Sequence, residues 1–427
     1  MKSYHRFVKC SFKSLVVVGL ASLVASAAAQ TLNFNLLHTF TNSPDGALPG
    51  DGYSYGVPPL LDAKGNLIGT TTWGGAANCV QETGCGTVYR IDKSGHYSVL
   101  YSFTGKSDGS NPWASVTEDA AGDLYGAAAG NGAIPAPSSV FKLTQAGELT
   151  VLHDFTGVPD GDVANTTPIL DTAGNLYGTT LTGGYVCNSQ YFESGCGVIY
   201  KVDAKGQYSV IHTFKTIADG FQPQGLAIDA AGNLYGSTGW GGEPCLLGKA
   251  LGCGTVYKLD RSGKYTVLHR FLSKDGEFPL PVTVDAAGNV YGITVGGGDL
   301  NCFPPDGCGT IFKIDAGGEF SVLYTFTSAI VNNAAFNTPI LDSRGNFYDT
   351  QSHQGGDGGF LFKLDTSGTF TELFVFPNPR DDFKDGANAS GVAMDTKGDF
   401  YGTMGTGGDF DCDTSRAGCG TVFKLAP

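Results

Sequence analysis

One stretch of the chain, Asp229–Phe271, decides the fold. It begins D-A-A-G-N-L-Y-G-S-T-G-W-G-G, passes a loop that holds Cys245, and ends G-C-G-T-V-Y-K-L-D-R-S-G-K-Y-T-V-L-H-R-F. Its opening motif, D-x-x-G-[ND]-[LVF]-[YI], begins at Asp62, Asp119, Asp171, Asp229, Asp285, Asp342 and Asp395. The intervals between these aspartates range from 52 to 58 residues. Seven copies at a nearly constant period indicate a repeat architecture.

Each copy contains four short apolar runs, which in the third copy span residues 167–171, 175–181, 197–203 and 208–214. The runs are rich in β-branched and aromatic residues, and no window has a sustained helical period. Gly174 and Gly206 stand where tight hairpins need a positive φ. The pattern predicts an all-β fold, a seven-bladed β-propeller of four-stranded blades with almost no helix.

The two ends of the chain together supply the four strands of one repeat. The last copy supplies three strands and stops at Pro427, while Leu32–Phe40 (L-N-F-N-L-L-H-T-F) matches the fourth strand of the other copies. We therefore predict that the N-terminal strand completes the last blade and closes the ring, which removes the unpaired edges of an open array.

The first residues have a separate role. Lys2, Arg6, Lys9 and Lys13 precede an apolar run and the small residues Ala25–Ala29, which is typical of a secretory signal peptide cut after Ala29. An uncleaved anchor is the alternative, although the run is shorter than the ~20 residues of a membrane span. We expect residues 1–29 to be a signal peptide and residues 30–427 a single propeller domain, secreted or periplasmic. No later stretch could cross a membrane, and the end K-L-A-P gives no C-terminal anchor signal.

The composition and net charge of the chain limit the classes of partner that it can bind. The sequence has 64 glycines and 41% hydrophobic residues, and removing residues 1–29 leaves 22 Lys+Arg against 40 Asp+Glu, a net charge of −18. An acidic surface repels phosphate backbones, so we expect no nucleic-acid partner. We expect a monomer without a cofactor or bound metal.

The cysteines of the mature chain fall into five pairs, one pair in each of five copies, and the other two copies lack both members. They are Cys79 with Cys85, Cys187 with Cys196, Cys245 with Cys253, Cys302 with Cys308, and Cys412 with Cys419. A disulfide within each blade is the simplest interpretation, and a zinc site is the alternative.

Blade geometry puts the tight turns on one face and the long, variable loops on the other. Function usually lies on variable loops held by a rigid scaffold, so the loop face and the channel mouth are the candidate site. Loop aromatics there could stack on sugars, anchor a protein or pack on neighbouring loops. The binding candidates are Trp73, Tyr185, Tyr191, Phe192, Trp240, Phe303 and Phe410.

Two further sets of polar residues have competing interpretations. Aspartates precede glycine in the connections between blades, at Asp45, Asp108, Asp160, Asp219, Asp275 and Asp385, where they could bind a cation or cap a turn. Histidines share one fourth-strand position that other copies fill with Tyr or Phe, which predicts packing; they are His38, His153, His212 and His269. His353, in a shortened loop, is the one candidate for acid–base chemistry.

The motifs G-N-L-Y-G-T-T, G-C-G-T-V-Y-K-L-D, Y-x-V-L-H-x-F and F-T-G-x-x-D-G resemble those of the secreted bacterial GloVer tandem-repeat proteins, described as choice-of-anchor proteins. The resemblance implies a repeat-built extracellular or envelope protein. Our leading hypothesis is a non-enzymatic module that binds a glycan or protein. The alternatives are a polysaccharide or lactone lyase or hydrolase at the channel mouth, and a structural envelope component.

Overall fold

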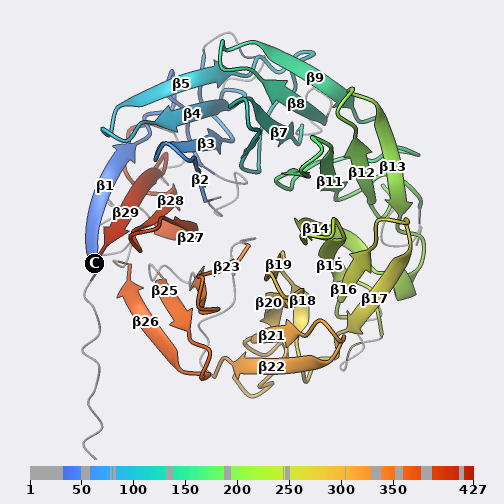
Figure 1. The fold of residues 1–427 in the computed structure, drawn as a ribbon. Helices are drawn as coiled ribbons and strands as arrows, with labels where there is room; N and C mark the ends of the chain where they lie inside the picture. Colours follow the sequence, from blue (N-terminus) through green and yellow to red (C-terminus); the bar gives the residue numbers. More distant parts are fainter. Residues whose placement is uncertain are drawn as a thin grey trace, which may run out of the picture. The chain divides into compact units, whose positions relative to one another are not determined.

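The fold was analysed in a computed structural model. The structure describes residues 32–49, 58–76, 79, 83–130, 138–186, 194–243, 245, 251–302, 304–327, 338–351, 359–376, 387–412 and 418–427. These residues form seven antiparallel sheets arranged in a ring (Figure 1), which confirms the predicted seven-bladed β-propeller. Within each blade the first strand lies nearest the central axis and the fourth lies at the rim.

Blades one to three share one pattern, with a two-residue first strand in each. Their strands are β2 (Leu60–Leu61), β3 (Leu67–Thr71), β4 (Thr87–Ile91) and β5 (Tyr97–Ser102); β6 (Thr117–Glu118), β7 (Leu124–Ala128), β8 (Ser139–Leu143) and β9 (Leu149–Asp154); β10 (Ile169–Leu170), β11 (Leu176–Thr180), β12 (Val198–Val202) and β13 (Tyr208–Thr213). A single 3₁₀ turn, η1 (Ile217–Asp219), is the helical element among the described residues, and it precedes blade four.

Blades four to six continue the same order, and the first strand of blade five is split in two. Their strands are β14 (Phe221–Ile228), β15 (Leu234–Trp240), β16 (Thr255–Leu259) and β17 (Tyr265–Arg270); β18 (Glu277–Pro279), β19 (Thr283–Val284), β20 (Val290–Gly296), β21 (Thr310–Ile314) and β22 (Phe320–Thr325); β23 (Ile340–Leu341), β24 (Phe347–Gln351), β25 (Phe360–Leu364) and β26 (Phe370–Val375).

Blade seven contains both ends of the described chain. It consists of β27 (Ala387–Met394), β28 (Phe400–Thr406), β29 (Thr421–Ala426) and β1 (Asn33–Thr39), with β1 antiparallel to β29. Asn33 pairs with Ala426 and Thr39 pairs with Thr421. The N-terminal strand therefore closes the ring, as the sequence predicts.

The repeated motif builds the hairpin between the first and second strands. In blade three, Asp171 accepts hydrogen bonds from the backbone N–H groups of Ala173 and Asn175 and from the Asn175 side chain. The Tyr177 hydroxyl donates to the other oxygen of the same carboxylate at 3.1 Å, and Lys201 of the third strand lies over the Tyr177 ring. These bonds lower the pKa of Asp171 although burial acts in the opposite direction. The aspartate, asparagine and tyrosine of the motif thus hold this hairpin together.

The core consists of apolar layers between adjacent blades. Each layer joins the third-strand aromatic residue of one blade to a phenylalanine that directly follows the fourth strand of the preceding blade, as in the edge-on contact of Tyr89 with Phe40 at 5.3 Å between ring centroids. This layered burial explains why the blades need their neighbours. Among the described residues, no helix is long and apolar enough to cross a membrane.

Candidate functional site

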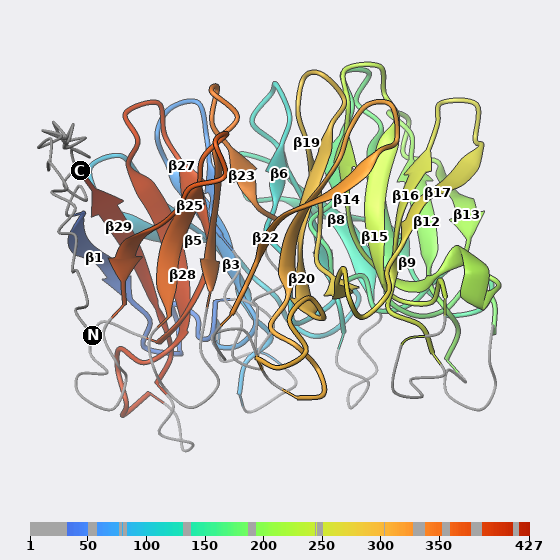
Figure 2. The same cartoon turned by 90° about the horizontal axis from the view of Figure 1, so that it is seen from below.

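The two faces of the ring differ as the sequence predicts. The hairpins that join first to second and third to fourth strands project from one face, and the long loops and blade connections project from the other (Figure 2). We call the second surface the loop face. Five candidates lie outside the described residues, and these five stay sequence predictions: Tyr191, Phe192, Phe303, His353 and Asp385.

Disulfides tie the loop face to the blades. Four pairs are bonded within their own blades, as predicted: Cys79–Cys85, Cys245–Cys253, Cys302–Cys308 and Cys412–Cys419. Cys196 is also disulfide-bonded, whereas Cys187 lies outside the described residues. The zinc alternative is therefore wrong for these four pairs, because a disulfide offers no thiolate ligand. The same holds where Cys245 and Cys253 gather with the buried Glu277.

The second cysteine of a pair also helps to join neighbouring blades. Its carbonyl accepts the N–H of a residue in the next connection, for example Leu48 bonded to Cys419 at 2.8 Å and Phe278 bonded to Cys253 at 2.9 Å. Leu48 and Phe278 adopt positive φ angles of 51° and 56°, an uncommon conformation for residues with side chains. The G-C-G segment is thus part of a blade-to-blade contact as well as a loop anchor.

The described loop aromatics divide into packed and exposed residues. Trp240 is half-buried and meets Phe278 edge-on at 4.0 Å between centroids. Trp73 is half-buried against the cluster that contains Phe40 and Ala47, and Phe410 is half-buried. Tyr185 differs, because its side chain is 52% exposed. These four candidates belong to four different blades.

Tyr185 lies in a small exposed apolar patch. Val158 and Val186 are 59% and 39% exposed, and we call these three residues the Tyr185 patch. The backbone beneath it is fixed, because Gly184 N–H donates to the Gly157 carbonyl at 3.0 Å and Cys196 N–H donates to the Tyr185 carbonyl at 3.0 Å. The patch therefore presents an aromatic ring on a well-supported backbone.

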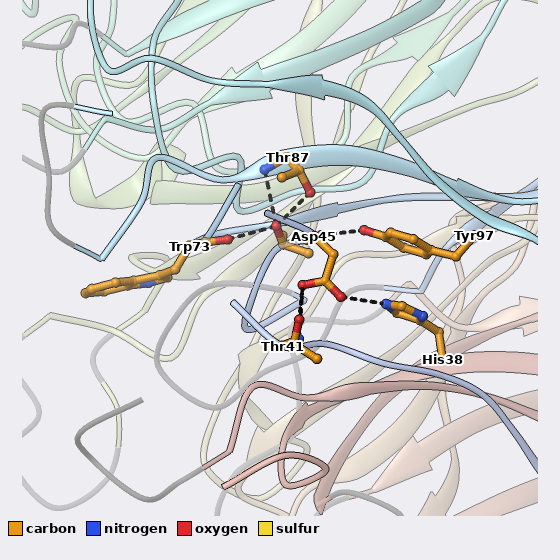
Figure 3. A network of polar contacts seen from close by, with 7 residues as sticks. His38, Thr41, Asp45, Trp73, Thr87 and Tyr97 are labelled. Atoms are coloured by element: carbon orange, nitrogen blue, oxygen red, sulfur yellow. Dashed lines mark hydrogen bonds and ion pairs between the residues drawn. The ribbon is translucent and has the colours of Figure 1, made fainter. Parts of the chain in front are cut away.

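Four aspartates of the Asp-Gly connections accept a backbone N–H of their own turn, namely Asp45, Asp108, Asp160 and Asp275. The Asp45 carboxylate accepts the backbone N–H and hydroxyl of Thr41 at 3.0 and 2.9 Å, and it lies 3.2 Å from the His38 ring (Figure 3). Burial raises the pKa of Asp45, but the bonds from His38 and Thr41 outweigh it and the net shift is downward. The Tyr97 hydroxyl donates to the Asp45 carbonyl.

The histidines pack as predicted. His38 stacks on Tyr97 of the next blade at 3.8 Å, and His153 stacks on Tyr208 at 3.6 Å while lying 2.9 Å from Asp160. Asp160 repeats the Asp45 arrangement through Thr156. These carboxylates are occupied by their own turns, which favours the capping interpretation over cation binding.

Grooves between blades occur on the hairpin face, which the sequence analysis does not single out. One of about 440 Å³ lies between blades three and four and is lined by Asp171, Tyr177, Lys201, Asp229 and Arg261 among others. A second, of about 320 Å³, lies between blades one and two and uses equivalent positions. Both grooves follow from the repeat, and the carboxylates of Asp171 and Asp229 are held by their own hairpins.

Blade six contains a polar pair that the sequence reasoning missed. Asp349 and Gln351 are 2% and 1% exposed, and burial raises the pKa of the Asp349 carboxyl to about 7. Among the described residues, neither polar atom of the Gln351 amide has a hydrogen-bond partner. The signal was present, because blade six reads F-Y-D-T-Q where blade three reads L-Y-G-T-T.

The chain was compared with known families and structures. Residues 23–192 and 185–414 match the model of the Gloeobacter/Verrucomicrobia repeat. No curated protein matches the chain.

Solved structures similar to this chain include three with low identity. One is a structural genomics target described as a gluconolactonase candidate, with 12% identity, 92% of each chain covered and a TM-score of 0.43. Another is a gluconolactonase from Xanthomonas campestris, with 15% identity, 76% of this chain and 89% of that chain covered, and a TM-score of 0.40. The tricorn protease has 14% identity, 77% of this chain and 26% of that chain covered, and a TM-score of 0.40. At these values no activity is transferred to this chain.

Proposed function

The chain belongs to the Gloeobacter/Verrucomicrobia repeat family, and we propose that this member is a non-enzymatic binding protein, secreted or periplasmic, that holds a glycan through the Tyr185 patch. The exposure of Tyr185 is the observation that carries the proposal. Equivalent positions after the Gly-Gly step hold Ala76, Glu243, Asp299 and Asp409. An aromatic ring at this position is therefore not required by the repeat.

The chemistry of the patch suits a sugar. A tyrosine ring offers a flat apolar face to the C–H groups of a pyranose, while its hydroxyl remains available for hydrogen bonds. A protein partner would need about 800 Å² on this side of an interface, which is more than the three side chains of the patch can supply. The acidic mature chain favours a neutral or cationic glycan over a polyanion.

The covalent structure supports a location outside the cytoplasm. The described residues include four complete disulfides, which fit an oxidising compartment such as the periplasm or the medium. Residues 1–29 have the sequence of a signal peptide. Both features suit a protein that meets polysaccharides of an envelope or of the surroundings.

The test is a glycan screen with the mature protein, residues 30–427, followed by titration calorimetry on each glycan retained. We expect Tyr185→Ala to weaken binding at least tenfold with unchanged thermal stability, because the ring is exposed. Val375→Ser is the matched control, since Val375 is 64% exposed on the rim strand β26 of another blade. Retention of no glycan by the wild-type protein, or equal binding by Tyr185→Ala, would refute the proposal.

The hydrolase alternative can be tested on the same protein. Two similar structures are described in terms of gluconolactonase, so glucono-1,5-lactone is a suitable first substrate. Turnover that His353→Ala abolishes would favour an enzyme, with His353 in acid–base chemistry. Capture of an envelope protein in place of any glycan would instead favour a protein partner.

A further inference from the structure

Asp349 occupies a position that six blades give to glycine. The equivalent residues are Gly69, Gly126, Gly178, Gly236, Gly292 and Gly402. A Cβ atom at any of these glycines would lie 2.3 to 2.5 Å from the aromatic ring that the third strand of the same blade places over it. The glycine thus leaves room for this ring. A carboxyl group at the same position in blade six takes up part of the space that the ring fills in the other blades.

The neighbouring ring in blade six is displaced accordingly. Asp349 pairs with Phe362 across the sheet. The centroid of Phe362 lies 6.0 Å from that of Phe326 in the preceding blade. The six corresponding distances in the other blades are 5.1 to 5.6 Å. Phe362 also lies 5.0 Å from Phe370 of its own blade, where the corresponding distances in blades one, three, four and five are 5.2 to 5.9 Å. The ring of blade six is therefore shifted towards the fourth strand at the position where the blade holds a buried carboxyl.

Gln351 departs from the repeat in the same way. Blades one, three, four and five place Thr71, Thr180, Thr238 and Thr294 at this position. In blades one, four and five these hydroxyls lie 2.9 to 3.0 Å from a threonine hydroxyl on the third strand. Gln351 instead pairs with Phe360, and its buried amide oxygen and nitrogen have no partner. Leaving such a group unpaired is unfavourable, so the fold gains nothing from it.

The surroundings of the pair combine rings with polar groups. Side chains alternate along a strand, so Asp349 and Gln351 share the face of β24 that holds Phe347. Phe347, Phe360 and Phe362 pack against residues of blade five. One Asp349 oxygen accepts the N–H of Thr350 at 2.8 Å. Gln351 ends β24, at the strand end that meets the loop face.

We propose that Asp349 and Gln351 form the polar end of a ligand site in blade six, facing blade five, that takes a small neutral molecule bearing hydroxyl groups, of monosaccharide or polyol chemistry. A carboxyl and a carboxamide together can accept from and donate to adjacent hydroxyls, and the phenyl rings suit the C–H groups of the same ligand. Near neutral pH the Asp349 carboxyl is partly uncharged and can donate as well as accept.

A divalent cation fits this set poorly. Calcium takes six to eight oxygen ligands, whereas the pair offers one carboxylate and one amide oxygen beside phenyl rings. The site is independent of the Tyr185 patch, since the two lie in blades six and three. If the Asp349 and Gln351 variants refute this site, the proposal for the Tyr185 patch is still tested separately by Tyr185→Ala.

The decisive variant is Asp349→Gly with Gln351→Thr, which gives blade six the residues that blades one, three, four and five use. We would measure thermal unfolding, and titrate wild type and variant with glucose, galactose, mannose, N-acetylglucosamine and glycerol. We expect the wild type to bind at least one of these, and the variant to bind it at least tenfold more weakly. We also expect the variant to unfold at the same or a higher temperature, because it restores the packing of the repeat.

Three results would overturn the proposal. They are binding of none of the five probes by the wild type, unchanged affinity in the double variant, and a lower unfolding temperature of the double variant, which would assign the pair a structural role. Val375→Ser, on the exposed rim strand β26 of the same blade, is the control variant and should leave binding at this site unchanged. Asp349→Asn keeps the side-chain volume, and we expect it to weaken binding with little change in stability.

Discussion

Replacing His212 by tyrosine should stabilise the protein in acid and leave it almost unchanged at neutral pH. His212 stacks on Tyr265 at 4.0 Å, and its buried Nε2 has no hydrogen-bond partner. His153, at the same position in blade two, has the Asp160 carboxylate at 2.9 Å. The difference arises in the next connection, where Lys215 stands in place of Thr156 and the chain turns into η1.

The magnitude follows from the protonation of His212. Burial lowers its pKa from 6.5 to about 4, with Asp219 opposing and Lys215 reinforcing this shift. The unfolded chain therefore binds a proton that the folded chain excludes, and stability is lost as the pH falls below 6.5 towards 4. At pH 5 the loss amounts to about 2 kcal/mol, and at pH 7.5 it is close to zero.

Urea unfolding at pH 7.5 and pH 5.0 would measure the effect. We expect His212→Tyr to exceed the wild type by about 2 kcal/mol in unfolding free energy at pH 5.0 only. Tyrosine suits the site, since Tyr101 and Tyr324 occupy equivalent positions. His153→Tyr is the matched control and should show no such gain, because the His153 ring already has the Asp160 carboxylate at 2.9 Å. A gain of equal size at both pH values would refute the reasoning, since it would reflect packing and not protonation.

Three other perturbations test the fold. Asp349→Gly should raise the unfolding free energy more at pH 8 than at pH 4, because burial raises the pKa of this carboxyl to about 7 and the unfolded chain releases its proton first; an equal gain at both pH values in urea unfolding would contradict this. Replacing Cys79 and Cys85 together by serine should cost less than about 3 kcal/mol, because the residues are only 6 apart in sequence; a larger loss in urea unfolding would mean that the pair holds the adjacent blade contact. Deleting residues 33–39 removes β1 and exposes the edge of β29, so light scattering should detect self-association, and a monomeric, equally stable variant would show that ring closure is dispensable.

Much of the fold could be predicted because each repeat contains the residues that form a specific tight turn. Asp171, Asn175 and Tyr177 satisfy one another within a single hairpin, so their spacing alone identifies the hairpin. The ring closure was also predictable, because Leu32–Phe40 has the pattern of a strand whose partner is missing at the other end. Both inferences depend only on short sequence motifs and on the number of predicted strands in each copy.

The candidate site was less predictable, because exposure depends on contacts between blades. Trp240 ends the second strand of blade four and Tyr185 follows the Gly-Gly step of blade three, and the sequence makes both of them binding candidates. Trp240 is covered because Phe278, from the next connection, meets its ring. Tyr185 remains 52% exposed. The partner that decides exposure belongs to a different repeat, and its side-chain direction cannot be read from spacing.

The repeat itself supplies a criterion for function. A residue that recurs in most blades, such as Gly178 beneath Tyr200, is explained by packing, since a Cβ there would meet the Tyr200 hydroxyl. A residue that departs from the recurring type and lowers stability has no such explanation. Asp349 and Gln351 meet both conditions, since one displaces a core ring and the other buries an unpaired amide. Tyr185 meets the first condition, and its exposure costs the fold little. The repeat therefore directs the search for function to blade six, where a carboxyl replaces a glycine and an unpaired amide is buried.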